Sequence, residues 1–255
     1  DGRPGWHIEC SAMAMEYLGH TLDIHTGGVD LAFPHHENEI AQSEGSTGYK
    51  FARFWMHCEF LNVDMQKMSK SLGNIYTLRD LVEMGYTPEA LRMALMSVPY
   101  RKKLNFTLDN LKGSQTSIER LRNYKLRLET DKLPPGRNAS IDDTAKEALA
   151  KYEAALDDDL NTAEALAAIF EFVRETNVHL DSGQFQQDNR HAALDLLERF
   201  DRVFDVLNLT LAEGGLSDFE IDALANERTA AKKAKNFARA DEIRNQLAEL
   251  GIVLE

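Results

Sequence analysis

A short loop rich in lysine and serine, residues 67–71, separates a strand-like segment from a helix-like segment. Residues 60–64 have the composition of a short strand, and Thr77 can cap a helix that Gly85 ends. A strand, a loop and a helix in this order are typical of open α/β sheets, whose ligands bind beyond the strand ends. The segment therefore predicts an α/β domain with a ligand-binding loop.

The side chains of this loop are suited to phosphate. Lys67 and Lys70 can place ammonium charges beside phosphate oxygens, and Ser69 can donate from its hydroxyl. Gly73 lets the loop turn and lets the backbone approach a ligand. Composition alone favours a solvated loop with two surface lysines. The complete string KMSKS, however, resembles the signature of class I aminoacyl-tRNA synthetases, whose loop closes over ATP and stabilises the departing pyrophosphate.

Three residues before the loop could converge on a metal ion. His35 and Glu39 stand at i and i+4 of a helix that Pro34 opens, so they share one helical face. Cys10 is expected at the start of another helix, capped by Ser11, where a thiolate is favoured. Thiolate, imidazole and carboxylate are all zinc ligands. The pair alone is usually a surface pair and the cysteine alone a core residue, so the metal hypothesis depends on both.

Two neighbouring segments carry weaker signals. A strand over residues 21–25 is followed by a turn in which Gly28 permits close backbone approach and Asp30 could accept from ribose hydroxyls. A plain turn is the better interpretation of these two residues alone. In the aromatic stretch further on, we expect Phe54 and Trp55 to pack in the core.

Composition restricts the compartment and the partners. Two cysteines, Cys10 and Cys58, are too few for a disulfide scaffold and favour a reducing compartment. No apolar run approaches the roughly 18 residues of a membrane span, and no signal peptide is evident. We therefore expect a cytoplasmic protein without membrane association. The formal net charge of -13 argues against nonspecific nucleic-acid binding but leaves room for a local basic face.

The remaining two thirds of the chain are predicted to be helical. Residues 108–129 have long helical character, and the proline- and glycine-containing segment 134–138 breaks it. Three helices follow at about 141–157, 161–181 and 189–208, with apolar residues at helical spacing. Their short connections predict an antiparallel bundle.

A local basic cluster lies near the C-terminus of this acidic chain. A capping-box pattern at residues 217–220 opens a helix that is followed by further basic residues. Such a cluster could contact tRNA phosphates, with a solvated helix face as the competing interpretation. The candidates for tRNA contact are Arg228, Lys232, Lys235 and Arg239.

Three strings make the resemblance more specific. GRPGWHIECS at residues 2–11, FPHHENEIAQS at residues 33–43 and KMSKS at residues 67–71 occur in this order. Together they resemble the cysteinyl-tRNA synthetase family, in which two cysteines, a histidine and a glutamate hold one zinc ion per subunit. The resemblance implies that three of these ligands are Cys10, His35 and Glu39.

The resemblance also implies the reaction and its partners. The family joins L-cysteine to AMP using MgATP as substrate and transfers it to tRNA(Cys), and we expect a monomer. Cysteine and serine are nearly isosteric, so a pocket separates them poorly, whereas zinc prefers thiolate to hydroxyl. Matching positions imply that Trp6 lies at the substrate cysteine and that Gly28 and Asp30 lie at the ATP ribose. They also imply that the ATP phosphates are bound by Lys67, Ser69 and Lys70, and that Lys67 and Lys70 are catalytic.

The implied fold is α/β plus all-α: the C-terminal part of a Rossmann-type class I synthetase catalytic domain, a helical bundle and a small C-terminal domain. The family's HIGH motif and fourth zinc ligand belong to an N-terminal half without a match here, so we expect these 255 residues alone not to activate cysteine. The expected domains are 1–76 (catalytic part), 77–111 (stem contact), 112–208 (tRNA-binding bundle) and 209–255 (anticodon recognition).

Two alternatives remain open. The cysteine ligase of mycothiol synthesis shares the zinc and KMSKS chemistry but has no anticodon-recognition domain, which residues 217–255 resemble. A noncatalytic tRNA-binding module is the second alternative. Retained tRNA affinity without zinc would support it, whereas the three zinc-ligand positions and the intact lysine loop weigh against it.

Overall fold

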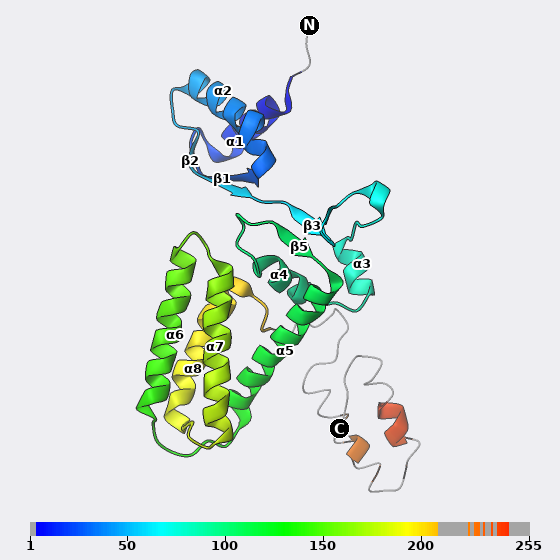
Figure 1. The fold of residues 1–255 in the computed structure, drawn as a ribbon, viewed down its shortest axis with the longest axis vertical. Helices are drawn as coiled ribbons and strands as arrows, with labels where there is room; N and C mark the ends of the chain where they lie inside the picture. Colours follow the sequence, from blue (N-terminus) through cyan, green and yellow to red (C-terminus); the bar gives the residue numbers. More distant parts are fainter. Residues whose placement is uncertain are drawn as a thin grey trace. The chain divides into compact units, whose positions relative to one another are not determined.

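The computed structural model describes residues 4–208 and, beyond them, residues 224, 227–229, 232, 236 and 239–244. The chain divides into two compact units, Asp1–Leu207 and Asn208–Glu255. The first unit contains an α/β part and a helical bundle, drawn from blue to yellow in Figure 1. The predicted combination of α/β and all-α structure is therefore confirmed.

The α/β part begins with two helices and two strands. Its elements are α1 (Trp6–Leu18), β1 (Leu22–Gly28), α2 (Glu37–Thr47) and β2 (Ala52–Cys58). The strands pair in parallel, with Leu22 opposite Ala52 and Gly28 opposite Cys58. Parallel strands need a long crossover connection, and the segment containing α2 supplies it. The turns Val29–Leu31 and Ala32–His36 thus follow the carboxyl end of β1.

A second small sheet leads into the lysine-rich loop. Its strand order is β4-β3-β5, with β3 (Leu61–Val63) antiparallel to β4 (Gln66–Lys67) and parallel to β5 (Leu104–Phe106). The predicted strand therefore turns back through Asp64 and Met65, both in the left-handed region, before the loop begins. Between β4 and β5 lie a helical turn at Lys70–Leu72, α3 (Leu78–Glu83) and α4 (Pro88–Met96).

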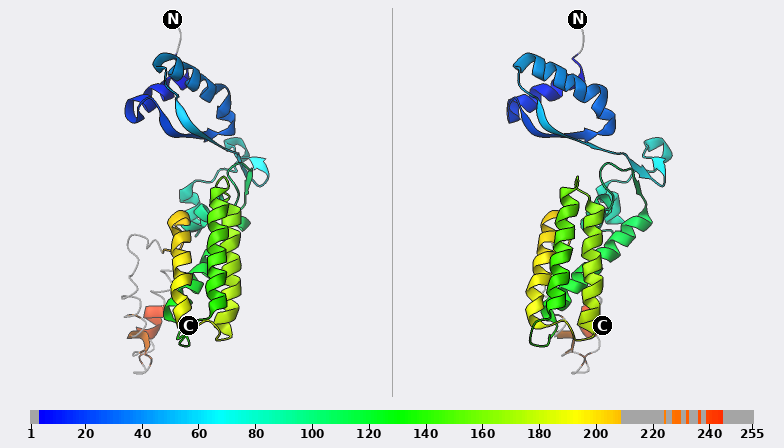
Figure 2. Two further views of the ribbon diagram at one scale, coloured as in Figure 1. Left: turned by 90° about the vertical axis from the view of Figure 1, so that its left-hand side faces the viewer. Right: turned by 60° about the vertical axis from the view of Figure 1, so that its left-hand side comes forward.

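The predicted helical bundle is present. It comprises α5 (Leu108–Thr130), α6 (Ala139–Asp157), α7 (Thr162–Asp181) and α8 (Arg190–Phe204). Both views in Figure 2, like Figure 1, show α6, α7 and α8 side by side. The buried residues of α5 recur at spacings of three, four and seven, which forms one apolar stripe toward the core: Leu111, Ile118, Leu121, Tyr124 and Leu128.

The structure corrects two details of the sequence interpretation. Ser11 does not cap a helix, because α1 already begins at Trp6 after Gly5; its hydroxyl instead accepts a hydrogen bond from Gln42. Phe54 does not pack in the core but is 68% exposed, since the stretch around it is strand β2 and its side chain lies on the outer face. Trp55 is half-buried against the small core that Phe51 helps to form.

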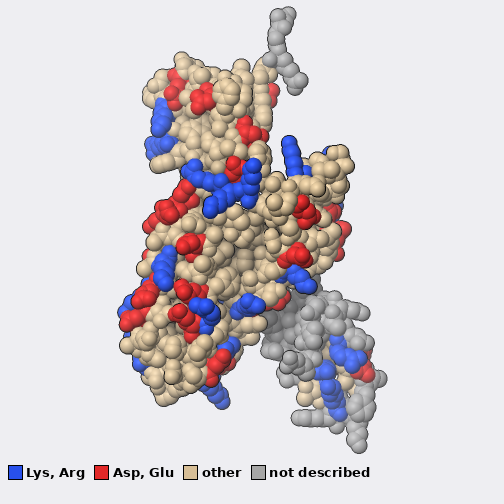
Figure 3. Space-filling view, in the orientation of Figure 1, with Lys and Arg blue, Asp and Glu red and all other residues tan. Residues whose placement is uncertain are grey.

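Among the described residues, no helix is both long enough and apolar enough to cross a bilayer. On the face drawn in Figure 3, acidic and basic side chains are interspersed over the helical part of the chain.

Candidate metal centre and nucleotide loop

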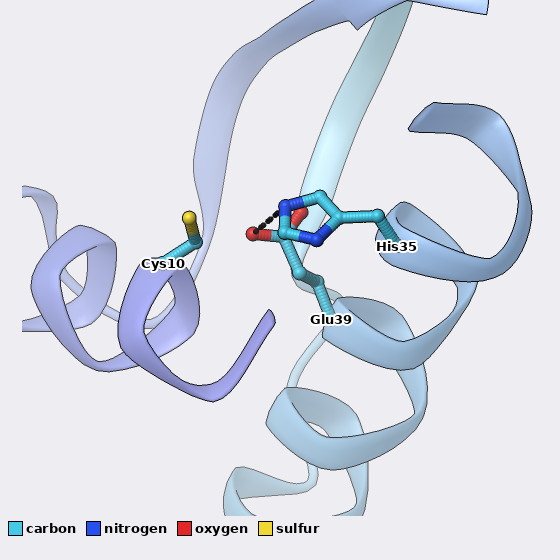
Figure 4. Close-up of side chains that lie close together, drawn as sticks. All are labelled: Cys10, His35 and Glu39. Atoms are coloured by element: carbon cyan, nitrogen blue, oxygen red, sulfur yellow. Dashed lines mark ion pairs between the residues drawn. The ribbon is translucent and has the colours of Figure 1, made fainter. Parts of the chain in front are cut away.

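Three of the predicted ligands converge on one point. Cys10 comes from α1, His35 from the helical turn Ala32–His36, and Glu39 from α2. One ligand atom of each lies within 4.8 Å of the others. Figure 4 shows the thiol of Cys10 facing the imidazole and carboxylate across the gap between the two helices. A thiol, an imidazole and a carboxylate together form a donor set suited to zinc.

Local geometry brings His35 and Glu39 together. Phe33 is extended, with φ -138° and ψ 133°, and helical geometry starts at Pro34, whose peptide bond with Phe33 is cis. His35 and Glu39 then stand one helical turn apart, with His35 Nε2 3.7 Å from Glu39 Oε1. The predicted i, i+4 placement is therefore present, although the sequence did not indicate the cis bond.

A single glutamine holds α1 against α2. Gln42 Nε2 donates to the carbonyl oxygen of His7 and to Oγ of Ser11, each at 2.5 Å. Cys10 lies between these two acceptors, on the second turn of α1 rather than at its start. Gln42 thereby fixes the part of α1 that presents the thiol to α2.

The carboxylate of Glu39 is incompletely satisfied by the protein. Glu39 is 0% exposed, and its Oε1 atom has no hydrogen-bond partner among the described residues. The 3.7 Å separation from His35 Nε2 is too long for a hydrogen bond. A buried carboxylate oxygen without a partner is destabilising, and a cation would relieve that cost. The residues present therefore fit a metal ion.

The Cys10 thiol requires a cation to ionise readily. Burial raises its pKa, and the negative charges of Glu39 and Glu9 raise it further. The helix-start effect expected from the sequence does not dominate, because the thiol lies within the helix and faces carboxylates. A metal ion would favour the thiolate and so oppose this upward shift of the pKa.

Two histidines that the sequence analysis did not assign, His25 and His36, lie near the other oxygen of Glu39, and His57 contacts one of them. His25 Nε2 lies 2.8 Å from Glu39 Oε2, and His36 Nδ1 lies 2.8 Å from His57 Nε2. Burial, followed by the charges of the neighbouring histidines, lowers the pKa of His36 to about 4. His25, His36 and Glu39 form a second group of possible metal ligands. The sequence signal that could have identified this group was the presence of histidines near the end of β1 and in β2.

The two glycines that the sequence analysis placed in a turn instead end strand β1, which runs to Gly28, and the turn itself starts at Val29. A Cβ atom on Gly27 would lie 2.7 Å from Cε1 of His36, and one on Gly28 would lie 2.4 Å from Oδ1 of Asp30. Any side chain at these positions would displace a neighbouring group of the site. Asp30 is exposed and can accept hydrogen bonds from a ligand.

Trp6 belongs to the metal-side cluster. Its ring centroid lies 4.3 Å from that of His35, and Trp6 is 60% exposed. An aromatic ring with one face on a candidate ligand and the rest open can form the wall of a substrate pocket.

The lysine-rich loop is held by its own side chains. Asn74 Oδ1 accepts from the amide of Ser69 at 2.8 Å, and Asn74 Nδ2 donates to the carbonyl of Lys67 at 3.2 Å. Met68 packs against the main hydrophobic core, whereas Lys67 and Lys70 are exposed. The loop thus has an anchored middle and two exposed ammonium groups.

The basic side chains near the C-terminus differ in whether their donor groups are already paired with carboxylates. Arg239 pairs with Glu227 and Glu242, each at 2.9 Å, and these carboxylates raise the pKa of its guanidinium. Lys232 is exposed, and the Nε atom of Arg228 is buried without a hydrogen-bond partner among the described residues. Lys235 lies outside the described residues. Arg239 is thus the candidate whose donors are already engaged.

A groove with several arginines in its lining lies between α5 and α7 of the bundle. Its volume is about 590 Å³, and its lining includes Arg120, Arg127 and Arg174. Arg127 donates to Asn177 and Asp181, each at 2.8 Å, while Arg120 is exposed. Several guanidinium groups in one groove are suited to bind phosphate groups.

Comparison with known proteins identifies the domains of the chain. Family models match residues 1–116 (tRNA synthetases class I (C) catalytic domain), residues 151–212 (DALR domain) and residues 215–255 (Cysteinyl-tRNA ligase anticodon binding domain). Among solved structures, the chain is similar to a LeuRS from Agrobacterium radiobacter in a ternary complex with tRNA and LeuAMS. The TM-score is 0.56 at 20% sequence identity, and the match covers 71% of this chain and 25% of the LeuRS chain. The fold is thus that of a class I tRNA synthetase.

Curated relatives define the family. The Cysteine--tRNA ligase of Solibacter usitatus is 61% identical over 254 residues, covering 100% of this chain and 54% of that protein. The corresponding ligase of Koribacter versatilis is 51% identical over 282 residues, covering 100% of this chain and 57% of that protein. The chain belongs to the cysteine--tRNA ligase family and spans about half the length of these relatives.

Proposed function

We propose that this chain forms the zinc-bearing and phosphate-binding part of a cysteine--tRNA ligase. The reaction is activation of L-cysteine with MgATP to cysteinyl-AMP, followed by transfer to tRNA(Cys). The observation that carries the proposal is the convergence of Cys10, His35 and Glu39 around a buried, unpaired carboxylate oxygen. A general nucleotide-binding or tRNA-binding protein has no need of this donor set.

Cys10, His35 and Glu39 would hold one zinc ion. Zinc supplies selection of thiolate over hydroxyl, which separates cysteine from serine. The chain's own contribution is the orientation of the ligands: Gln42 fixes α1, and the helical turn fixes His35 over Glu39. The exposed part of Trp6 would form the wall against which the amino acid lies.

The ATP-binding side would be built from the turn and the lysine-rich loop. Gly28 and Asp30 would receive the ribose, with the carboxylate accepting from its hydroxyls. Lys67 and Lys70 would neutralise charge on the phosphates as pyrophosphate departs, which is where stabilisation of the transition state is needed. Ser69 would donate to the same anion.

The helical parts would bind the nucleic acid. Phosphates of tRNA(Cys) would contact the arginine-lined groove between α5 and α7, and Lys232 and Arg228 of the second unit would add contacts. Assignment of residues 77–111 to the acceptor stem and of residues 209–255 to the anticodon rests on the family resemblance. We further propose a cytoplasmic monomer, which size-exclusion chromatography with light scattering tests.

The decisive experiment is charging of tRNA(Cys) with radiolabelled cysteine, with serine as the control. It is run on the 255-residue chain alone and on a protein extended to the full length of the relatives. We expect the extended protein to charge cysteine but not serine, and the chain alone to show no cysteine-dependent ATP–pyrophosphate exchange. Activation without charging would favour the mycothiol-type ligase. tRNA binding without zinc or activation would favour the noncatalytic module.

A further inference from the structure

The two oxygens of the Glu39 carboxylate have different surroundings. Oε1 faces His35 Nε2 at 3.7 Å and has no hydrogen-bond partner among the described residues. Oε2 lies 2.8 Å from His25 Nε2 and 4.0 Å from His36 Nε2. Only the contact with His25 has the length of a hydrogen bond. The carboxylate is therefore held at one oxygen and free at the other.

His25 is itself held in place by aromatic packing. Its ring lies edge-on to Trp55 at a centroid distance of 4.8 Å and edge-on to Phe51 at 5.7 Å. His25 also stands directly opposite Trp55 in the pairing of β1 with β2. A ring fixed in this way presents Nε2 to Glu39 from a strand rather than from a mobile loop.

We propose that His25 is a positioning residue that orients Glu39 for the metal ion. Its Nε2–H donates to Oε2, which prevents rotation of the carboxylate and leaves Oε1 directed toward Cys10 and His35. Outer hydrogen bonds of this kind fix metal ligands, and their removal typically weakens metal binding about 10–100-fold. The inference deepens the proposed zinc site and rests on it.

A competing arrangement uses the same histidine differently. His25, His36 and Glu39 could themselves hold a cation, since their ligand atoms also lie within 4.8 Å of one another. In that arrangement no thiolate contacts the metal. Cobalt(II) in place of zinc distinguishes the two, because a thiolate ligand gives a charge-transfer absorption that imidazole and carboxylate do not.

The test measures metal affinity rather than activity. Zinc dissociation constants are obtained by competition with a chromogenic chelator for the 255-residue chain and its variants. His25→Phe preserves the aromatic packing and removes the N–H donor, and His25→Gln restores a donor near the position of Nε2. His20, an exposed histidine stacked on Tyr49, supplies the matched control His20→Ala.

We expect His25→Phe to weaken zinc binding 10–100-fold while cobalt-loaded protein keeps its thiolate absorption. His25→Gln should recover most of the affinity, and His20→Ala should match the wild type. Wild-type affinity in His25→Phe, or a wild-type cobalt complex without thiolate absorption, would overturn the positioning role. If circular dichroism shows that His25→Phe does not fold, His25→Leu takes its place.

The outcome also separates this inference from the proposed function. A wild-type chain that binds no zinc would reject the metal centre and the role of His25 with it. A wild-type chain that binds zinc, accompanied by a His25→Phe variant of equal affinity, would reject the role of His25 alone.

Discussion

The sulfur of Cys10 and a carboxylate oxygen of Glu39 lie within 4.8 Å of each other although they belong to different helices. This proximity requires α1 and α2 to pack in one register, which Gln42 enforces through His7 and Ser11. Without a cation the thiol does not ionise readily, because burial and then the charge of Glu39 raise its pKa. The packing of α1 against α2 therefore favours the binding of a cation between Cys10 and Glu39.

The first prediction concerns the thiol. Cys10→Ser should lower zinc affinity by about a hundredfold or more, because a hydroxyl is a poor zinc ligand and the loss exceeds that of an outer contact. Chelator competition measures it. Cys58→Ser is the matched control, since Cys58 is exposed at the end of β2 and outside both ligand groups found among the described residues. Equal losses in the two variants would contradict the assignment of Cys10.

The sequence was sufficient for features that depend on neighbours a few residues away. Thr77 was predicted to cap a helix, and its hydroxyl accepts from the amide of Asp80. The bundle helices were likewise predicted, because an apolar stripe at helical spacing is visible in the sequence. His35 and Glu39 were paired for the same local reason.

Features that depend on packing between elements could not be predicted in this way. Ser11 looked like a cap because nothing local shows that Gln42 would occupy its hydroxyl. Phe54 looked like a core residue because the sequence does not say which face of β2 is covered. His25 reaches Glu39 only through the pairing of two strands and the packing of α2. Cys10 was proposed as a ligand from the chemistry of its thiol and then from the family resemblance, but its distance from His35 and Glu39 depends on how α1 packs against α2 and could not be predicted.

A second prediction concerns the lysine-rich loop. Asn74→Ala removes two hydrogen bonds that close the loop on Ser69 and Lys67. Each is worth about 1 kcal/mol, so the loss of both raises the open population about thirtyfold. Limited trypsin digestion followed by mass spectrometry should show faster cleavage after Lys67 and Lys70. Asn123→Ala, at an exposed position of α5, should leave these rates unchanged; faster cleavage in both variants would count against the clamp.

A third prediction concerns acid stability of the bundle. Burial by itself would raise the pKa of Asp142, but hydrogen bonds from Arg137 and Asn189 outweigh it and lower the pKa below 3.8. The folded state therefore binds this proton less readily than the unfolded state. The resulting stabilisation is complete above the unfolded pKa and is lost as the pH falls through the lower, folded pKa.

Asp142→Asn should consequently destabilise the chain by about 2 kcal/mol at pH 7, where hydrogen bonds to a charged group are lost. Thermal melting at several pH values measures this, and the difference from wild type should shrink as the pH falls below 3.8. Asp143→Asn is the control, because that neighbouring carboxylate is 67% exposed and pairs with Lys146 at the surface. A difference that persists unchanged into acid would reject the linkage.

The last prediction separates the functional role of Glu39 from its effect on stability. Glu39→Gln keeps the shape of the side chain and an oxygen for His25, but it removes the buried charge whose Oε1 atom lacks a partner. The metal-free variant should therefore melt at the wild-type temperature or above it, because the contact of Oε2 with His25 only partly offsets desolvation of the carboxylate and Oε1 has no hydrogen-bond partner among the described residues. Zinc affinity should fall, because a neutral amide is a weaker ligand than a carboxylate. In the extended protein, the KM for cysteine should rise with it. If Glu39 contributed to stability alone, Glu39→Gln would instead lower the melting temperature of the metal-free protein and leave zinc binding unchanged.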